Sequence, residues 1–152
     1  MLEILRKRRE DDERGFTLIE LMVVVLIIAI LIAIAIPTFL GARSRAQDRA
    51  AQSNLRNALT AEKTFYTDRQ AYSQTPSDLS AIEPSLSYVA LAASLSPNQV
   101  GLSTANNGAD VYLEGQSSSG SCFWIHDSTS TGTQYSRAAC ATAAPSSWNA
   151  SW

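Results

Sequence analysis

The chain has 152 residues, with two cysteines, one histidine and a formal net charge of −2 at pH 7. This length suits one small globular domain together with a membrane segment. The mildly acidic balance argues against general nucleic-acid binding, which requires a basic face. One histidine and two cysteines, without a glycine-rich phosphate-binding loop, make no catalytic set and no structural zinc site. We therefore expect a protein that is not an enzyme and that needs no cofactor or metal.

Residues 1–15 form a leader, which we interpret as a processing segment rather than as part of the fold. Its charged run, Arg6–Arg14, ends at Gly15, and its acidic and basic residues balance, so removing the leader leaves the net charge of −2 unchanged. The positive-inside rule counts bases on both sides of a membrane segment, so it favours a cytoplasmic N-terminus only slightly. Four bases follow soon after the apolar segment, namely Arg43, Arg45, Arg49 and Arg56.

A hydrophobic helix is predicted over residues 16–37. An unbroken apolar run extends from Leu21 to Ile36, and residues 16–36 would measure about 32 Å as a helix, which is enough to cross a bilayer. One carboxylate, that of Glu20, lies near the start of this segment. A carboxylate is costly in hydrocarbon, so we expect Glu20 to have a partner and a function.

Residues 15–37 resemble the class III signal of type IV prepilins. The resemblance is carried by Gly15, by Phe16-Thr17-Leu18-Ile19-Glu20, by the apolar run and by Pro37. The resemblance implies cleavage after Gly15 by a prepilin peptidase, N-methylation of Phe16 and assembly into a homopolymeric filament. It also implies an assembly ATPase and an inner-membrane platform protein as machinery. The chain would cross the inner membrane once, with a cytoplasmic leader and an outside head, and would then enter an extracellular pilus that serves adhesion, twitching motility or DNA uptake.

The same resemblance implies a role for Glu20, namely pairing with the free amine of Phe16 on a neighbouring subunit. In a dry filament core each charge alone is costly, and together they neutralise. A wrong stagger would leave both charges unpaired, so the pair would also fix the axial register. The alternative interpretation is a charge near a helix end that reaches the lipid headgroups.

Pro37 lacks a backbone N–H and clashes with the carbonyl of Ala33, so a kink or local melting is expected there. Gly41 weakens the same turn further. Residues 38–72 then form the amphipathic half of one long helix of roughly 80 Å, whose first half must be buried outside its own head. The apolar stripe of this half comprises Ala51, Leu55, Ala58, Leu59, Phe65, Tyr66 and Tyr72.

Residues 73–152 are predicted to form a small β head, which makes the fold class α+β. The region after Ser73-Gln74-Thr75-Pro76 is expected to be a loop, with turns at Asn106–Gly108 and Gly115–Gly120. We expect an antiparallel sheet, because its connections are too short for crossovers. The predicted strands are Leu86–Ala92, Val100–Ser103, Val111–Glu114, Cys122–His126 and Thr133–Ser136.

In an exported head, the simplest interpretation of Cys122 and Cys140 is one disulfide, worth about 3 kcal/mol to a small domain. His126 and Asp127 are strand neighbours that point to opposite faces, so they make no catalytic pair. Asp110 lacks the spacing of a known calcium loop, so we interpret it as part of a turn.

Two surface features remain from the sequence. The cluster Arg43, Arg45 and Arg49 is interpreted as a lipid-headgroup anchor or a solvated helix face, with pairing to Asp48 or Glu62 of another subunit as an alternative. The aromatic residues are expected to fill the core where the helix meets the sheet; they are Phe65, Tyr66, Tyr72, Phe123, Trp124 and Tyr135.

Two rivals to a pilus subunit stay open. The nearer is a minor pilin or a secretion pseudopilin, against which the C-terminal cysteine pair weighs because it resembles the disulfide-bonded region of pilins. The other is a secreted soluble protein cut after Ala35, since Ala33-Ile34-Ala35 fits a signal-peptidase site. Glu20 inside the apolar region and Pro37 just beyond that cut weigh against the second rival.

Overall fold

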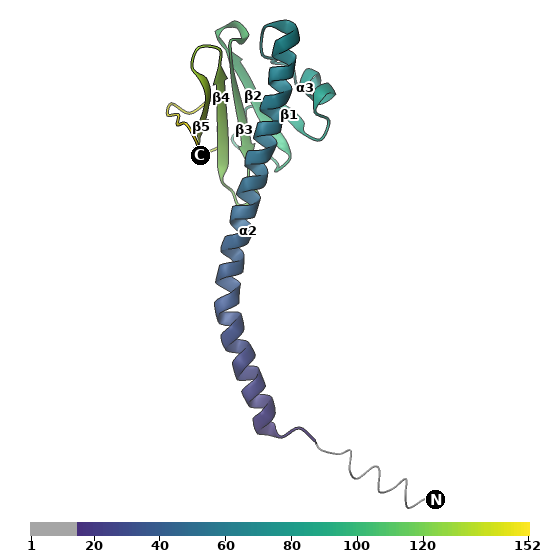
Figure 1. Cartoon of the computed structure of the whole chain (residues 1–152), viewed down its shortest axis with the longest axis vertical. Coiled ribbons are helices and arrows are strands. Elements are labelled where there is room, and N and C mark those ends of the chain that lie inside the picture. Colours follow the sequence, from purple (N-terminus) through teal and green to yellow (C-terminus); the bar gives the residue numbers. More distant parts are fainter. Residues whose placement is uncertain (1–14) are drawn as a thin grey trace, which may run out of the picture. The chain divides into compact units, whose positions relative to one another are not determined.

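The computed structural model describes residues 15–152, and the leader prediction for residues 1–15 therefore lies almost wholly outside the described part. The chain divides into two compact units, one ending at Gly41 and the other spanning Ala42–Trp152. With the labels of Figure 1, the elements are α2 (Leu18–Arg69), α3 (Pro76–Ile82), β1 (Ser87–Ala90), β2 (Gln99–Ala105), η1 (Asn106–Gly108), β3 (Asp110–Gln116), β4 (Cys122–Ser128) and β5 (Gly132–Ser136).

The helix α2 is helical throughout, although it contains Pro37. Thr38 supports this turn, because its hydroxyl donates to the carbonyls of Ala35 at 2.8 Å and Ile34 at 3.3 Å. Local melting, one of the two outcomes predicted at Pro37, therefore does not occur. The predicted kink at Pro37 and Gly41 stays a prediction.

Within the unit Ala42–Trp152, the second half of α2 packs on one face of the sheet, as the amphipathic stripe predicts (Figure 1). The helix lies close to the sheet at Gly115, where a β-carbon would lie 3.0 Å from Cγ of Leu55. Gly115 lies inside β3 and not in the predicted turn, which is formed instead by residues 117–121. The stripe residues that are buried are Ala51, Leu55, Ala58, Leu59 and Tyr72.

The end of α2 is set by Gln70, which has a positive φ of 57° and donates its backbone N–H to the carbonyl of Tyr66 at 2.8 Å. The loop predicted after Thr75 is wrong, because α3 begins there with Pro76 in its first turn. Proline suits that position, since its fixed φ matches a helix and the first N–H groups of a helix have no partner.

The five predicted strands are all present and pair in the order β1-β2-β3-β4-β5. The predicted antiparallel pairing is confirmed from β2 to β5, whereas β1 and β2 are parallel, which was not predicted. Since β1 has only four residues, the segment 91–98 is long enough to return the chain to the start of β2 without a crossover helix. The predicted turn at Asn106–Gly108 is confirmed, with φ between 52° and 81°.

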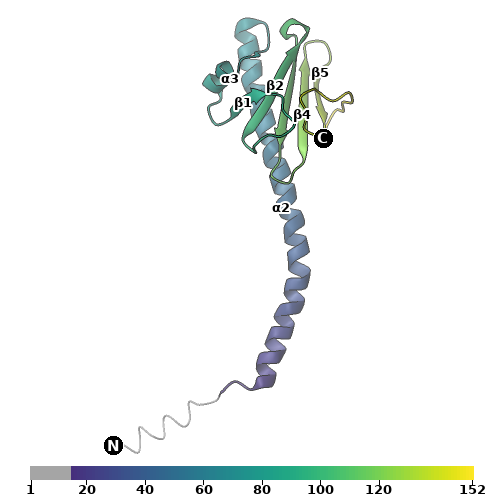
Figure 2. The same ribbon diagram turned by 180° about the vertical axis from the view of Figure 1, so that it is seen from behind.

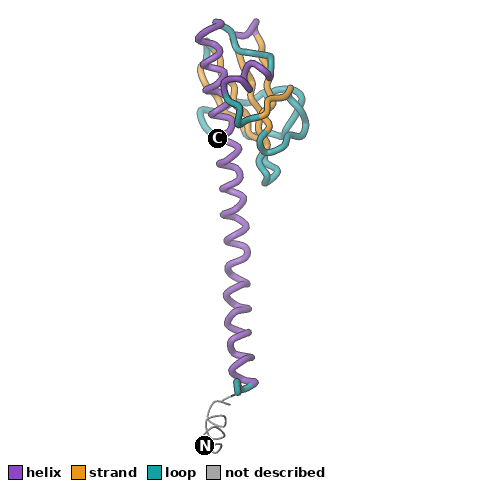
Figure 3. Tube along the Cα trace, turned by 90° about the vertical axis from the view of Figure 1, so that its right-hand side faces the viewer, coloured by secondary structure: helices purple, strands orange, loops and turns teal. Residues whose placement is uncertain are grey.

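The sheet separates the predicted aromatic core into two faces. Phe123 packs against α2 with the other apolar residues of β3 and β4. Trp124 is fully buried as well, but its ring donates an N–H to the carbonyl of Ala139, in the C-terminal segment, at 3.3 Å. Adjacent strand residues point to opposite faces, so the two rings cannot share one core. Figure 2 shows the head from behind, and Figure 3 shows the second half of α2 and the strands as two layers with loops beyond the strands.

Candidate assembly site

The start of α2 is closed by a reciprocal capping box between Thr17 and Glu20. The backbone N–H and the hydroxyl of Thr17 both donate to Oε2 of Glu20 at 2.8 Å, and the N–H of Glu20 donates to Oγ1 of Thr17 at 3.2 Å. This pattern satisfies backbone donors that the first turn of a helix leaves free. This role of Thr17 was not predicted, although the spacing Thr-x-x-Glu before an apolar run is a signal for it.

Both bonds to the carboxylate of Glu20 engage the same oxygen, Oε2, while the third bond uses the backbone N–H of Glu20. The hydrogen bonds formed within residues 15–152 leave its second oxygen, Oε1, without a donor. The capping box also fixes the side chain at the end of the helix, because it holds Oε2 from two sides. Glu20 is thus oriented by its own chain and still able to accept a further donor.

The segment that follows is apolar on every side and is unburied along its length. Its large hydrophobic side chains, from Phe16 to Leu40, are between 47% and 84% exposed. By length and composition, the stretch beginning at Leu18 is able to cross a membrane. A surface this large and apolar is unfavourable in water, so a bilayer or other apolar helices must cover it.

The basic residues Arg43, Arg45 and Arg49 are all exposed on α2. Of the two acidic partners considered for them, Asp48 already lies 3.9 Å from the guanidinium of Arg137 in its own head. Glu62 is excluded as a surface partner, because its side chain is fully buried. The proposed pairing with Glu62 of another subunit is therefore wrong.

Glu62 is a buried carboxylate that sequence reasoning missed, although its spacing of seven residues from Leu55 and four from Ala58 places it on the apolar stripe. It accepts the backbone N–H of Ser73 at 2.9 Å, while its other oxygen has no partner among the described residues. Burial, and to a smaller extent the negative charge of Asp78, raise its pKa to about 7, against the lowering effect of the Ser73 bond. The folded head therefore holds a carboxyl group that titrates near neutral pH.

His126 and Asp127 point to opposite faces, as predicted from their adjacency. The His126 ring stacks on Tyr112, with ring centroids 4.6 Å apart. Asp127 lies on the helix face, where it accepts the Tyr72 hydroxyl and lies 3.2 Å from Nζ of Lys63. The two residues therefore anchor different layers and form no catalytic pair.

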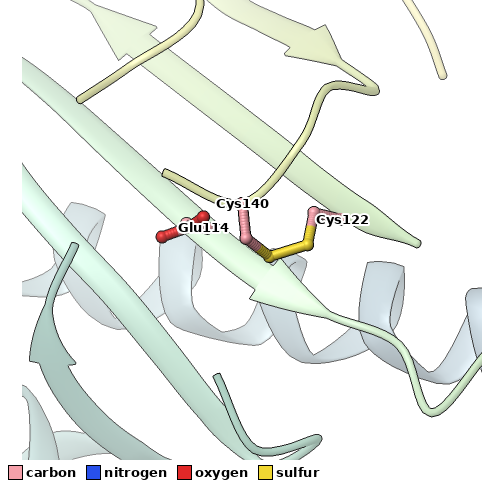
Figure 4. Close-up of side chains that lie close together, drawn as sticks. All are labelled: Glu114, Cys122 and Cys140. Atoms are coloured by element: carbon pink, nitrogen blue, oxygen red, sulfur yellow. A yellow bond between two sulfur atoms is a disulfide. The ribbon is translucent and has the colours of Figure 1, made fainter. Parts of the chain in front are cut away.

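Cys122 and Cys140 form the predicted disulfide, with Cα atoms 5.4 Å apart. The carboxylate of Glu114 lies beside it, and Figure 4 shows the three side chains together. Because the two sulfurs are bonded to each other, they offer no thiolate to a metal ion. Glu114 itself is fully buried, and burial raises its pKa against the lowering effect of hydrogen bonds from Ala141 and Ala92.

Comparison with known proteins places these features in a family context. A family model described as the prokaryotic N-terminal methylation motif matches residues 11–36. The type IV major pilin protein PilA of Myxococcus xanthus is 47% identical over 66 residues, which cover 43% of this chain but only 30% of the relative. The type II secretion system core protein G of Pectobacterium carotovorum is 31% identical over 70 residues, covering 46% of this chain and 45% of the relative.

A longer match covers most of the chain. The type IV wide pilus major component PilA4 of Thermus thermophilus is 30% identical over 112 residues, which cover 74% of this chain and 79% of the relative. The match therefore extends well beyond the methylation motif, and the long helix with its mostly antiparallel five-stranded sheet accompanies it. On this evidence, the chain belongs to the type IV pilin family.

Proposed function

We propose that this chain is a structural subunit of a type IV pilus-like filament. The observation that carries the proposal is the apolar segment from Phe16 to Leu40, which is exposed on every side and begins with an oriented carboxylate. Packing of such segments against one another would bury this surface and leave the heads outside. The role is structural rather than catalytic, which agrees with the pilin relatives.

Glu20 gives this packing a defined stagger. Cleavage after Gly15 would create a cationic amine at Phe16, and the methylation motif over residues 11–36 supports this processing. The capping box occupies Oε2 of Glu20, so the oxygen left to accept the amine of a neighbouring subunit is Oε1. The chain would wait in the inner membrane, with its leader in the cytoplasm, for the peptidase, the assembly ATPase and the platform protein.

A secretion pseudopilin is the second candidate, because the two core protein G relatives match 46% and 49% of this chain. Their matches cover 45% and 52% of those relatives, whereas the wide-pilus match covers 79%. The Cys122–Cys140 disulfide also favours a pilus subunit. Deleting the gene separates the two, since loss of surface filaments supports a pilin and loss of protein secretion alone supports a pseudopilin.

Processing is tested on the exported protein itself. N-terminal sequencing and intact mass should show a chain that begins at methylated Phe16. The matched variant Gly15→Leu should accumulate as an unprocessed membrane precursor, because a bulky side chain replaces the hydrogen next to the scissile bond. Mature protein of normal size from this variant, or a wild-type chain beginning at Ile36, would contradict the proposal.

The assembly role of Glu20 is tested with Glu20→Leu and Glu20→Gln, co-expressed with the wild type. Both variants should be cleaved and inserted, yet be depleted in sheared filaments relative to their membrane pool by tenfold or more. The physical reason is the unpaired amine that they leave in the filament core, which costs roughly 3–5 kcal/mol when a buried pair is broken.

A further variant separates pairing from capping. Thr17→Val removes the hydroxyl of the capping box but leaves the carboxylate in place, so it should reduce incorporation much less than Glu20→Leu does. Incorporation of Glu20→Leu at the wild-type level would remove the basis for the pairing.

A further inference from the structure

The face of the sheet away from α2 holds a carboxylate in a pocket built for it. Glu114 on β3 lies opposite Gly101 on β2, where a β-carbon would come within 3.0 Å of its Oε2 atom. Its Oε1 atom accepts the N–H of Ala141 at 2.8 Å, and Oε2 accepts that of Ala92 at 3.3 Å. The pocket therefore joins β2, the loop after β1 and the segment after Cys140 around one buried acid.

This acid lies next to the Cys122–Cys140 disulfide, and within residues 15–152 it has no ion-pair partner. One of its oxygens and the sulfurs of Cys122 and Cys140 all lie within 4.8 Å of one another (Figure 4). Among the ion pairs within residues 15–152, none involves Glu114. Across the strands it faces Gly101 and Trp124, neither of which ionises. A buried carboxylate without a cation is costly, so its position beside the sulfurs calls for a chemical explanation.

The two cysteines differ in their access to solvent. Cys122 is only 5% exposed, whereas Cys140 is half-buried. Both line a surface cavity of about 490 Å³ together with Arg137, whose guanidinium donates to the Ser121 hydroxyl at 2.9 Å. Because Cys140 is the more exposed of the two, an external disulfide or thiol entering this cavity would reach Cys140 more readily than the nearly buried Cys122.

We propose that Glu114 is the proton acceptor that closes the Cys122–Cys140 disulfide. In the first step, the Cys140 thiolate attacks an external disulfide, forms a mixed disulfide and releases one external thiolate. In the second step, the Cys122 sulfur attacks the Cys140 sulfur as its thiol proton passes to Glu114, directly or through one water. The bond between Cys140 and the external sulfur breaks, and a second external thiolate leaves. Two electrons pass from the cysteines to the external disulfide.

The buried acid suits this step because a thiol reacts only after it loses its proton. Burial disfavours the Cys122 thiolate just as it disfavours the Glu114 carboxylate, so transfer between the two avoids making a second buried charge. Burial also raises the pKa of Glu114, which brings it closer to that of a thiol and favours the transfer. Closure takes place within the head, whichever filament the chain enters.

The test uses the full-length chain in detergent, reduced and then exposed to glutathione disulfide from mildly acidic to mildly alkaline pH. Quenching with an alkylating agent and mass spectrometry resolve the dithiol, the glutathione adduct and the closed form. In Glu114→Gln, the adduct at Cys140 should accumulate, and ring closure at neutral pH should slow by about tenfold or more. The matched control is Glu62→Gln, which changes another fully buried glutamate and should close like the wild type.

The pH profile separates proton transfer from a purely structural role. Wild-type closure should level off above the pKa of Glu114, whereas closure of Glu114→Gln should keep rising with ionisation of the thiol. In guanidinium the chain is unfolded and the pocket is absent, so the disulfides of the wild type and of Glu114→Gln should close at equal rates. The proposal would be overturned if the disulfide of Glu114→Gln closed at the wild-type rate, or if its closure were slower by the same factor at every pH. If the variant does not fold, a wild-type rate that rises steadily to alkaline pH overturns it equally.

Discussion

Glu62 shows how a single residue couples the helix to the turn that follows it. Its carboxylate holds the N–H of Ser73, just after the end of α2, yet one of its oxygens is buried without a partner in the part of the chain described. A pKa of about 7, against 4.5 for an exposed glutamate, means that the folded head binds a proton more tightly than the unfolded chain. Protonation of Glu62 therefore stabilises the head.

The sign of the pH dependence follows from this raised pKa. The stabilising contribution of Glu62 is complete below about pH 4.5 and is lost as the pH rises through about 7. Over this interval the free energy of unfolding should fall by up to about 3 kcal/mol. Glu62→Gln mimics the protonated form, so its advantage over the wild type should grow as the pH rises over that interval. Denaturant unfolding across pH measures it, with Asp68→Asn as the exposed control on the same helix. Parallel stability curves for Glu62→Gln and wild type would show that Glu62 does not titrate in this range.

At the scale of elements, the C-terminal segment contributes far more than its sequence indicates. The indole N–H of Trp152 lies within hydrogen-bonding distance of the carbonyls of Trp124 and Ser136, at 3.2 and 3.1 Å. Its ring meets Tyr135 edge-on at 4.6 Å, and the guanidinium of Arg56 on α2 lies 4.9 Å from the centre of that ring. The last residue thus ties β4, β5 and α2 together, although the tail lacks any periodic pattern.

Truncation of this residue tests the contribution of the segment. Trp152→Ala should lower the free energy of unfolding by roughly 2–4 kcal/mol, because it removes a partly buried ring and both carbonyl contacts. Trp152→Phe retains a ring without the N–H and should lose about half as much. Thermal or denaturant unfolding of the oxidised protein measures both. A change below the experimental error in Trp152→Ala would mean that the segment is not part of the cooperative unit.

At the scale of the whole molecule, we expect the head to fold on its own and the apolar segment to require other molecules. The buried core starts at Ala51 and lies entirely within the unit Ala42–Trp152. None of the most apolar stretch near the start of α2 is buried by its own chain. Removal of residues 1–41 should therefore cost the head little stability and remove its need for detergent.

A fragment spanning residues 42–152 tests this division. It should be soluble without detergent, unfold cooperatively and melt within a few degrees of the head in the full-length chain. A fragment that begins after Leu59 is the matched control, because it lacks Ala51, Leu55 and Ala58 of the core and should not fold. Circular dichroism in the near ultraviolet reports the packing. A non-cooperative 42–152 fragment would show that the apolar segment stabilises the head.

The sequence by itself determined the features that depend on local composition and period. The apolar run after Glu20, the stripe around Leu55 and the five strands all follow from hydrophobicity repeating along the chain. The resemblance to prepilins, carried by Gly15 to Glu20, indicated the family for the same reason, since its motif is contiguous. A contiguous signal needs no knowledge of what lies opposite it in space.

Only the tertiary structure decided which residues meet across the fold. The parallel pairing of β1 with β2, the burial of Glu62 and the place of Trp152 in the core each join segments that are distant in sequence. The pocket around Glu114 and the disulfide also joins segments that are distant in sequence. It requires a glycine at position 101 across the sheet, because a β-carbon there would lie 3.0 Å from Oε2 of Glu114. Hydropathy along one chain carries no record of cross-strand neighbours, so a buried carboxylate cannot be told from a solvated one until the strands are paired.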